Sequence, residues 1–317
     1  MKSITLVNLH FGTFKNYFPI FLNSCKNNPT VNFLIVTDQK ITSPAPNVII
    51  KNMTFEECKT KIQELFDFPI NLKSPYDLCD YKVVYGELFS EELAGSDFWG
   101  YCDTDLIFGD IRKFITDDIL QKYEKVLIRG HFTLFRNLKD INAIYRNKLP
   151  DGEERFKQVF SEDGVHHFDE GMPQITNGIN TLFDNALGWD KVYDKYVFMD
   201  LCVSSFSFIN ADFINDKEEL KKSEHSYFLY DNGKLFRVLQ NGNREEFMYI
   251  HFQKRNMKIK NVDGDSQEYY IIPNKFVSLN GISQKRLLRS NNQKIYWSKL
   301  FERINGKLKR TFGAVFK

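Results

Sequence analysis

Cysteine is scarce in this chain, and no two cysteines form a CxxC pair. The 317 residues include only five cysteines, an odd number at wide and irregular spacing. Zinc knuckles need closely spaced thiols, and the disulfide frameworks of secreted domains need a dense, even set. We therefore expect reduced thiols, buried as small apolar side chains. The five positions are Cys25, Cys58, Cys79, Cys102 and Cys202.

Long apolar runs are also missing. The N-terminal stretch MKSITLVNLHF is interrupted by Asn8 and His10, and it has no small-residue cleavage site of the kind that ends a signal peptide. No segment approaches the roughly 18–20 apolar residues of a membrane-spanning helix. These two features predict a protein of the cytosol or of the cytosolic face of a membrane.

The chain shows no overall excess of one charge. Its 43 Lys and Arg residues against 41 Asp and Glu give a net charge of +2, which excludes a generally basic nucleic-acid binder. The average hides two parts, because residues 281–317 hold ten basic residues and one acid, Glu302. Their local charge of +9 leaves about −7 on residues 1–280. The composition, 42% hydrophobic, is that of a folded globular protein.

Strand and helix patterns alternate in the first half of the chain. Thr54 starts one of the helices, and Glu57 three residues later completes a capping-box pattern. This order predicts an α/β protein whose sheet has helices on both faces and binds ligands at the carboxyl ends of its strands. The expected strands are residues 3–9, 32–37, 47–50, 97–102 and 125–129, and the expected helices are residues 14–25, 54–68 and 78–89.

The second half is less regular. Residues 171–183 have a helical pattern, and residues 247–252 have a strand pattern that ends near His251. Asp231-Asn232-Gly233 separates two apolar runs, which predicts a hairpin.

The C-terminal end differs from the rest of the chain. Tyr296, Leu300, Ile304 and Leu308 recur at intervals of four among basic residues, which predicts a basic amphipathic helix. We therefore expect one main domain over residues 1–275 and a basic tail over 276–317. Binding to an anionic membrane surface and packing against the body of the protein are both compatible with this tail. RNA binding is disfavoured, because no recognition module accompanies the basic residues.

Asp103-Thr104-Asp105 follows the apolar strand pattern of residues 97–102. Two carboxylates one residue apart repel each other, and a bound divalent cation offsets that repulsion. Mg²⁺ and Mn²⁺ prefer such oxygen ligands and commonly bridge from them to substrate phosphates. An Asp-x-Asp pair alone is common in turns, so its position after a buried strand is what points to a metal site.

Four stretches of the chain resemble bacterial GT-A-fold glycosyltransferases of capsule and surface-polysaccharide biosynthesis. They are residues 17–38, residues 75–110 with the sequence CDTDLIFGD at their end, HFTLFRN at 131–137 and HFQKR at 251–255. The resemblance implies a GT-A-like, Rossmann-type mixed sheet flanked by helices. It implies transfer of a hexose, galactose or glucose by default, from a UDP-sugar with Mn²⁺ or Mg²⁺. The implied acceptor is a lipid-linked or oligosaccharide precursor of a surface or capsular polysaccharide.

The same resemblance assigns roles to residues around the metal. Asp103, Asp105 and His251 would hold the cation, and Lys254 would contact the diphosphate. Asp169 or Glu170 would act at the reacting sugar or the acceptor hydroxyl. The remaining donor-side positions are Val7, Asn8 and Asp38 toward the nucleotide, Lys82 and Tyr85 on a preceding helix, Thr104 between the two aspartates, and His131 within reach of the donor or acceptor sugar.

Plainer interpretations of these residues stay open at this point. Asp38 also fits a strand-end turn, Lys82 a solvated surface cation, and His251 a strand histidine paired with its neighbours. Asp169 and Glu170 also fit acids that a helix N-terminus favours. The chain has no Gly-rich phosphate loop, so a metal would have to neutralise much of the diphosphate charge.

Two other functions use similar features. A non-catalytic sugar-nucleotide or glycan-binding module would need the scaffold without the chemistry. A metal-dependent nucleotidyltransferase would use the same pair of carboxylates, but it would form or consume pyrophosphate instead of releasing UDP.

Overall fold

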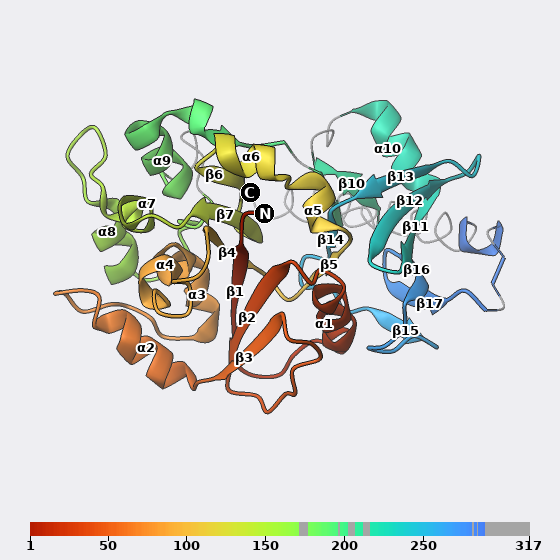
Figure 1. The fold of residues 1–317 in the computed structure, drawn as a ribbon, viewed down its shortest axis with the longest axis horizontal. Helices are drawn as coiled ribbons and strands as arrows, with labels where there is room; N and C mark the ends of the chain where they lie inside the picture. The colour runs from red at the N-terminus through yellow and green to blue at the C-terminus, as the bar shows by residue number, and fades with distance from the viewer. Residues whose placement is uncertain are drawn as a thin grey trace, which may run out of the picture. The chain divides into compact units, whose positions relative to one another are not determined.

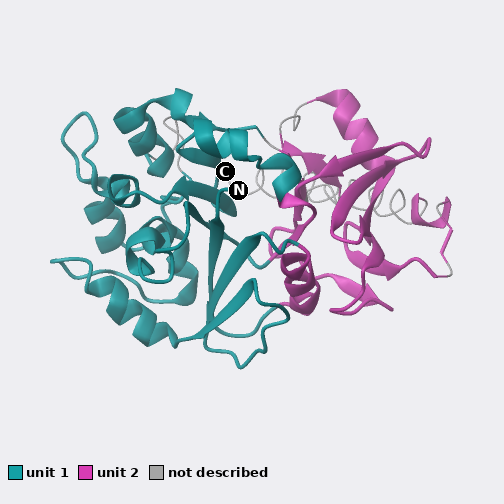
Figure 2. Cartoon of the chain, viewed as in Figure 1, with its two compact units in different colours: residues 1–14, 28–104, 112–195 teal, residues 15–27, 105–111, 196–317 magenta. Residues whose placement is uncertain are grey.

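The computed structural model describes residues 1–170, 177–195, 197–201, 207–211, 216–280, 282–283 and 285–288. The chain separates into two compact units (Figure 2). Unit 1 comprises residues 1–14, 28–104 and 112–195, and unit 2 comprises residues 15–27, 105–111 and 196–317.

Unit 1 is built on a mixed seven-stranded sheet in the order β3-β2-β1-β4-β7-β6-β8 (Figure 1). The β1, β2, β3 and β4 strands are parallel, whereas β7 runs antiparallel to both β4 and β6. The predicted mixed α/β fold is confirmed. The strands are β1 (Ile4–His10), β2 (Val31–Thr37), β3 (Val48–Asn52), β4 (Phe98–Cys102), β6 (Lys125–Arg129), β7 (Phe132–Arg136) and β8 (Val192–Tyr193).

Helices flank this sheet, and α4 packs against β4 while α7 packs against β7. The predicted capping box of α2 is confirmed, because the Thr54 hydroxyl accepts from the Glu57 amide and the Glu57 carboxylate accepts from the Thr54 amide. The helices are α2 (Phe55–Gln63), α3 (Leu78–Tyr81), α4 (Tyr85–Leu88), α5 (Ile111–Phe114, whose first residue belongs to unit 2), α6 (Asp117–Lys122), α7 (Lys139–Asn142), α8 (Arg155–Ser161) and α9 (Ile179–Leu187), with 3-10 turns η1 (Pro75–Asp77), η2 (Lys82–Val84), η3 (Ile144–Arg146) and η4 (Trp189–Lys191).

Unit 2 contains a four-stranded sheet, β10-β9-β14-β5, and a six-stranded sheet, β13-β12-β11-β16-β17-β15. The predicted hairpin is confirmed, with Asn232 and Gly233 at positive φ between β11 and β12. The elements are α1 (Phe18–Lys26), β5 (Leu106–Phe108), β9 (Phe198–Leu201), β10 (Phe208–Asn210), α10 (Lys217–Glu224), β11 (Ser226–Asp231), β12 (Lys234–Leu239), β13 (Arg244–Phe247), β14 (Tyr249–His251), β15 (Lys258–Lys260), β16 (Glu268–Ile272) and β17 (Lys275–Ser278).

The expectation of one strand over residues 247–252 was wrong. β13 ends at Phe247 and pairs with β12, whereas β14 begins at Tyr249 and pairs with β5 and β9. The break falls at Met248, whose amide donates to the Val197 carbonyl at 2.8 Å and whose carbonyl accepts from the Gly109 amide at 2.7 Å, in line with the pairing of β14 and no longer with β12. The chain therefore changes sheets at this residue, although its apolar pattern continues through it.

Several expectations concern residues outside the described part of the chain. The helix expected over 171–183 is described only from residue 177, and α9 begins at Ile179. The amphipathic pattern after residue 288 and the division at 275/276 remain predictions. Cys25, Cys58, Cys79 and Cys102 are free thiols, and three of them are buried, whereas Cys79 is half-buried. Within the described ranges, no helix has the length and apolarity needed to cross a bilayer.

Candidate active site

Strand pairing in unit 2 places His251 beside Asp105. β14 pairs antiparallel with β5 so that His251 lies opposite Leu106, the residue after Asp105. The Phe252 amide also donates to the Asp105 carbonyl at 2.9 Å. His251 Nε2 consequently lies 3.6 Å from Asp105 Oδ1. The Asp105 carboxylate is almost fully buried, so an opposing charge or a cation is needed to stabilise it.

A tight turn after β14 closes over the same carboxylate. Gln253 and Lys254 have φ values of 49° and 60°, and the Arg255 amide donates to the Phe252 carbonyl at 3.1 Å, as in a type I′ turn. Residues with a Cβ rarely adopt this conformation, which costs about 1–2 kcal/mol per residue. The Lys254 amide donates to Asp105 Oδ2 at 2.5 Å. The strained turn thus orients the Asp105 side chain.

A second carboxylate lies beside the other ring nitrogen of His251. β9 pairs parallel with β14, with Asp200 opposite His251, and Asp200 Oδ1 lies 3.0 Å from His251 Nδ1. Burial alone would lower the pKa of His251, but the Asp105 and Asp200 carboxylates raise it to about 10. A metal at Nε2 must therefore displace a proton.

Asp103 is tied to this group by the chain, since a single residue separates it from Asp105. Asp103, Asp105 and His251 each offer one ligand atom, and these atoms lie within 4.8 Å of one another. Two hard carboxylates suit Mg²⁺ and Mn²⁺, and an imidazole oriented by a second carboxylate is the usual arrangement around a metal-ligating histidine. The donor set fits a divalent cation, with Mn²⁺ favoured over Mg²⁺ because of the nitrogen ligand.

Lys82 of unit 1 links two of the predicted acids. Its Nζ donates to Asp103 Oδ1 at 2.7 Å and to the Gly130 carbonyl at 2.7 Å, and it lies 3.5 Å from Asp169 Oδ2. Only 13% of the side chain is exposed, so Lys82 is a paired cation and not a solvated one. Burial would lower the pKa of Lys82, but the carboxylates of Asp103 and Asp169 raise it above its usual value.

Asp169 is buried and held by its backbone. The Tyr101 hydroxyl donates to the Asp169 carbonyl at 2.5 Å. The buried Asp80 carboxylate accepts from the His166 and Phe168 amides, both at 2.7 Å, which fixes the preceding loop. Burial raises the pKa of Asp169 to about 7, although Lys82 opposes this rise. A carboxyl group with a pKa near neutrality can take up and release a proton at physiological pH.

Glu170 faces the same backbone segment as Asp169. Its Oε2 accepts from the Gly130 amide at 3.0 Å. A Cβ at Gly130 would collide with the Asp169 carboxylate, so this position needs glycine for close approach. The alternative that these acids cap a helix does not apply to α9, because its N-cap is Gly178 and its first turn contains no acid.

The other predicted residues lie in three environments. Asn8 is buried at the end of β1 and donates to the Cys102 carbonyl at 2.6 Å, directly before Asp103. Asp38 is exposed after β2 and accepts from the Gly12 amide at 2.9 Å. His131 is buried and its carbonyl accepts from the Asp103 amide at 3.1 Å.

The side chains of Val7 and Tyr85 lie in the core, and Thr104 is half-buried. Their roles toward a donor remain predictions.

Three positions in the site were not singled out from the sequence: Asp80, Gly130 and Asp200. Asp80 and Asp200 each interrupt an apolar segment, LCDY and FMDL, and a lone acid in such a segment is a usable signal. Gly130 follows β6 and belongs to no sequence motif. Only its spatial contact with Asp169 shows why a glycine is needed there.

A family model described as a family of unknown function (DUF6625) matches residues 6–280. The chain belongs to this family. The DUF6625 match includes every site residue described above, from Val7 to Lys254, and ends at residue 280. No curated protein matches the DUF6625 chain.

Solved structures similar to the DUF6625 chain include two of the galactosyltransferase LgtC. One is a complex with donor and acceptor sugar analogues, at 10% identity and a TM-score of 0.38. The other is an active-site mutant of LgtC, at 10% identity and a TM-score of 0.39. Each alignment covers 78% of this chain and 86% of the other.

Proposed function

We propose that the chain is a metal-dependent glycosyltransferase that transfers a hexose from a UDP-sugar to a surface or capsular polysaccharide precursor. The proposal rests on one observation: Asp105, its neighbour Asp103 and the Asp200-oriented His251 form a donor set for a divalent cation. The sequence resemblance to GT-A-fold glycosyltransferases supplies the reaction class, with galactose or glucose as the default sugar.

Asp103, Asp105 and His251 would hold the cation. When bound, Mn²⁺ or Mg²⁺ supplies electrostatic stabilisation for the negative charge that develops on the departing UDP. Lys254 is exposed beside Asp105 and would contact the diphosphate through its ammonium group. Its backbone amide is already engaged by Asp105. Asn8 and Asp38, at the carboxyl ends of β1 and β2, would face the nucleotide.

Asp169 would hold the proton that the acceptor hydroxyl releases as its oxygen bonds to the anomeric carbon. The bond from that carbon to the diphosphate oxygen breaks, and UDP leaves with its electron pair. A pKa of about 7 allows Asp169 to accept a proton at neutral pH. Lys82 would keep Asp169 and Asp103 in place, since it contacts both carboxylates.

The acceptor is proposed to be a lipid-linked or oligosaccharide precursor, and the basic residues of the tail support a membrane-bound acceptor. Truncation after Leu288 is the suitable test, because the Leu287 side chain is fully buried and its removal would disturb the core. Binding of residues 1–288 to anionic vesicles should be weaker than that of the full chain, with donor hydrolysis retained. Equal binding of the two proteins would contradict the membrane role.

The central test is a panel of UDP-, GDP- and CMP-sugars incubated with the full chain and Mn²⁺, with products separated by chromatography. We expect slow, metal-dependent release of UDP and free sugar from UDP-galactose or UDP-glucose. Asp105→Asn should reduce this release by at least about 100-fold, because one charged metal ligand is lost. Asp118→Asn, which neutralises an exposed acid of α6 outside the site, should retain activity.

Three results would overturn the proposal. Pyrophosphate release from a nucleoside triphosphate would indicate a nucleotidyltransferase. Donor binding without turnover, even with added glycan acceptors, would indicate a binding module. Full activity of Asp105→Asn in the presence of a chelator would exclude the metal-dependent site.

A further inference from the structure

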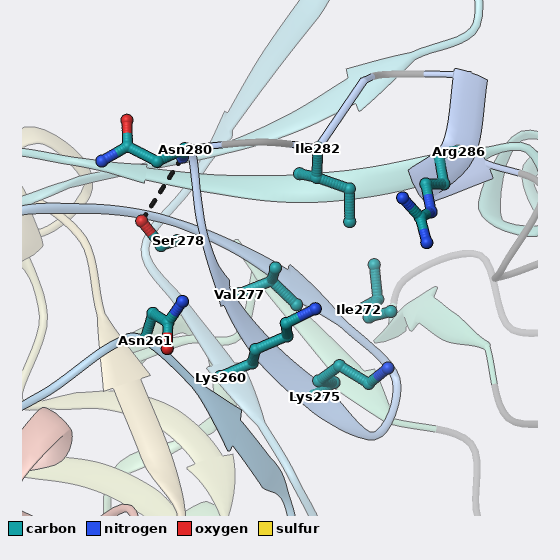
Figure 3. A pocket seen from close by; sticks show the side chains of 9 residues that line it. All are labelled: Lys260, Asn261, Ile272, Lys275, Val277, Ser278, Asn280, Ile282 and Arg286. Atoms are coloured by element: carbon teal, nitrogen blue, oxygen red, sulfur yellow. Dashed lines mark hydrogen bonds between the residues drawn. The ribbon is translucent and has the colours of Figure 1, made fainter.

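Unit 2 contains a cavity of about 220 Å³ on its six-stranded sheet, formed by other residues than the site described above (Figure 3). This volume far exceeds the roughly 10–15 Å³ that one water needs. The cavity is lined by residues of β15, β16 and β17, of the loops that follow β15 and β17, and of the turn before the last described residues. They are Lys260, Asn261, Ile272, Lys275, Val277, Ser278, Asn280, Ile282 and Arg286.

Three of the nine lining residues are cations and none is an acid. Lys260, Lys275 and Arg286 form no ion pair within the described part of the chain. Arg237 of the same sheet shows the contrast, because it is buried between Glu219 and Glu245. Three like charges around one cavity repel one another, and a bound anion offsets that repulsion.

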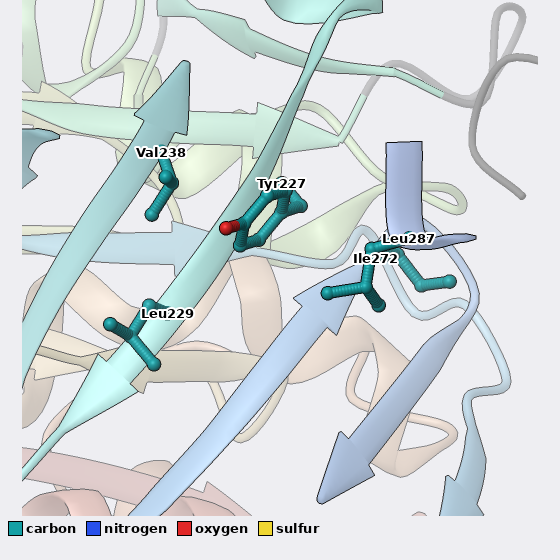
Figure 4. Close-up of a cluster of buried hydrophobic side chains, with 5 residues drawn as sticks. All are labelled: Tyr227, Leu229, Val238, Ile272 and Leu287. Carbon is teal, nitrogen blue, oxygen red and sulfur yellow. The ribbon is translucent and has the colours of Figure 1, made fainter. Parts of the chain in front are cut away.

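The cations are held in place by the fold. β15 and β17 pair in parallel, with Lys258 opposite Lys275 and Lys260 opposite Val277, which brings the Lys260 and Lys275 side chains to one cavity. Arg286 belongs to a helical turn over residues 285–288, and the next residue, Leu287, is fully buried against Tyr227, Leu229, Val238 and Ile272 (Figure 4). This packing anchors the backbone that carries Arg286.

The remaining lining residues indicate what kind of anion fits. Asn261, Ser278 and Asn280 add polar groups, and the Asn280 amide lies 3.4 Å from the Ser278 hydroxyl as a donor. Ile272 and Val277 are buried and give the cavity an apolar wall. A guanidinium with two ammonium groups matches the several oxygens of a phosphate or diphosphate.

We propose that this cavity, which we call the basic pocket, binds a phosphate or diphosphate group carried on a larger ligand. Residues 289–317 are an unsuitable occupant, because they carry eight basic residues against one acid and have the same sign as the pocket. The basic pocket is independent of the metal site and of the proposed transferase activity. It would recognise the phosphorylated end of a ligand, whatever is bound at the metal site.

The test measures binding of two probes to the full chain without divalent metal. Inorganic pyrophosphate represents a free phosphate ligand, and phosphatidylglycerol vesicles represent a lipid headgroup. The double variant Lys260→Glu/Arg286→Glu should lower affinity for the recognised probe by at least about tenfold, because two charge-assisted contacts are lost. Lys234→Glu, the same charge change at an exposed β12 residue outside the pocket, should change affinity less than about twofold.

If the double variant weakens pyrophosphate binding but leaves vesicle binding unchanged, the ligand is a free phosphorylated molecule. The same sensitivity in vesicle binding would identify a lipid phosphate. The single variant Arg286→Lys should keep much of the wild-type affinity, since the positive charge is kept. The proposal is overturned if the wild type binds neither probe, or if the double variant binds both as the wild type does. Metal-dependent UDP release is measured separately on each variant. It tests the transferase proposal without depending on the result for the basic pocket.

Discussion

Asp200 Oδ1 lies 3.0 Å from His251 Nδ1, on neighbouring parallel strands that place the two residues opposite each other. This contact occupies one ring nitrogen and turns the other, Nε2, toward Asp105. A histidine fixed in this way presents Nε2 to a metal without losing rotamer freedom on binding. Asp200 is therefore a positioning residue for the candidate metal site.

Replacing Asp200 tests this role directly. Asp200→Asn should lower Mn²⁺ affinity by about 10- to 100-fold, the usual cost of losing the partner that orients a ligating histidine. Isothermal titration of Mn²⁺ into the purified variant measures the effect. Asp118→Asn is the matched control, because its carboxylate is exposed in unit 1. Unchanged affinity in Asp200→Asn would show that His251 needs no such support or does not bind the metal.

Metal binding should depend on pH through His251. Its pKa of about 10 without metal means that the imidazole is protonated at neutral pH, and Nε2 must lose that proton to bind a cation. The apparent Mn²⁺ association constant should rise about tenfold per pH unit between about pH 6 and pH 8, as expected for one released proton. His251→Gln should bind more weakly and without this slope. A flat profile in the wild type would contradict the assignment of His251 as a ligand.

Lys82 should set the pH range in which Asp169 works. The Lys82 ammonium lowers the pKa of Asp169 against the effect of burial, so Lys82→Gln should raise that pKa above about 7. If ionised Asp169 accepts the acceptor proton, the acidic limb of kcat/KM should move to higher pH in the variant. The comparison needs pH profiles of both enzymes with saturating metal. A profile of unchanged shape but lower height would assign Lys82 to Asp103 alone.

Gly130 offers a steric test of the Asp169 position. Gly130→Ala would place a Cβ against the Asp169 carboxylate and displace it, at an expected cost of about 1–3 kcal/mol in unfolding free energy. UDP release should fall together with stability. Gly95→Ala is the control, because a Cβ there meets no atom within 4 Å. Wild-type turnover in Gly130→Ala would show that the observed Asp169 position is not needed for activity.

The buried Lys125 predicts a change of stability with pH. Its Nζ donates to the Leu127 carbonyl at 3.2 Å and to the Asn180 side chain. Burial lowers the pKa of Lys125 to about 7, although Asp169 opposes this shift. An unfolded lysine titrates near about 10.4. Between these values the unfolded state binds more protons, so the wild type gains stability as pH rises and loses it as pH falls toward 7.

Lys125→Met removes this linkage. Urea unfolding at about pH 7.5 and pH 9.5 should show the wild type gaining about 2 kcal/mol relative to the variant, because other titrating groups cancel in the difference. The same difference at both pH values would indicate that Lys125 keeps an ordinary pKa in the folded protein.

The parts of the fold that depend on neighbouring residues were predictable from the sequence. The Thr54 capping box and the Asn232-Gly233 hairpin turn are examples, since each involves groups two or three residues apart. The chain's change of sheet at Met248 was not predictable, because the residues on both sides have the same apolar pattern. Hydropathy shows that a strand is buried but does not identify its partner.

The sequence by itself determined that Asp103 and Asp105 are neighbours, because the chain joins them through one residue. It also predicted the strand that precedes them, and the resemblance to glycosyltransferases implied that His251, later in the chain, is the third metal ligand. Only the tertiary structure decided that His251 faces Asp105 and that Asp200 orients it. Those contacts depend on the register of β14 between β5 and β9. His251 is 145 residues from its β5 partner Leu106 and 51 residues from its β9 partner Asp200. Register between such distant segments depends on long-range packing, and no local pattern of either segment encodes it.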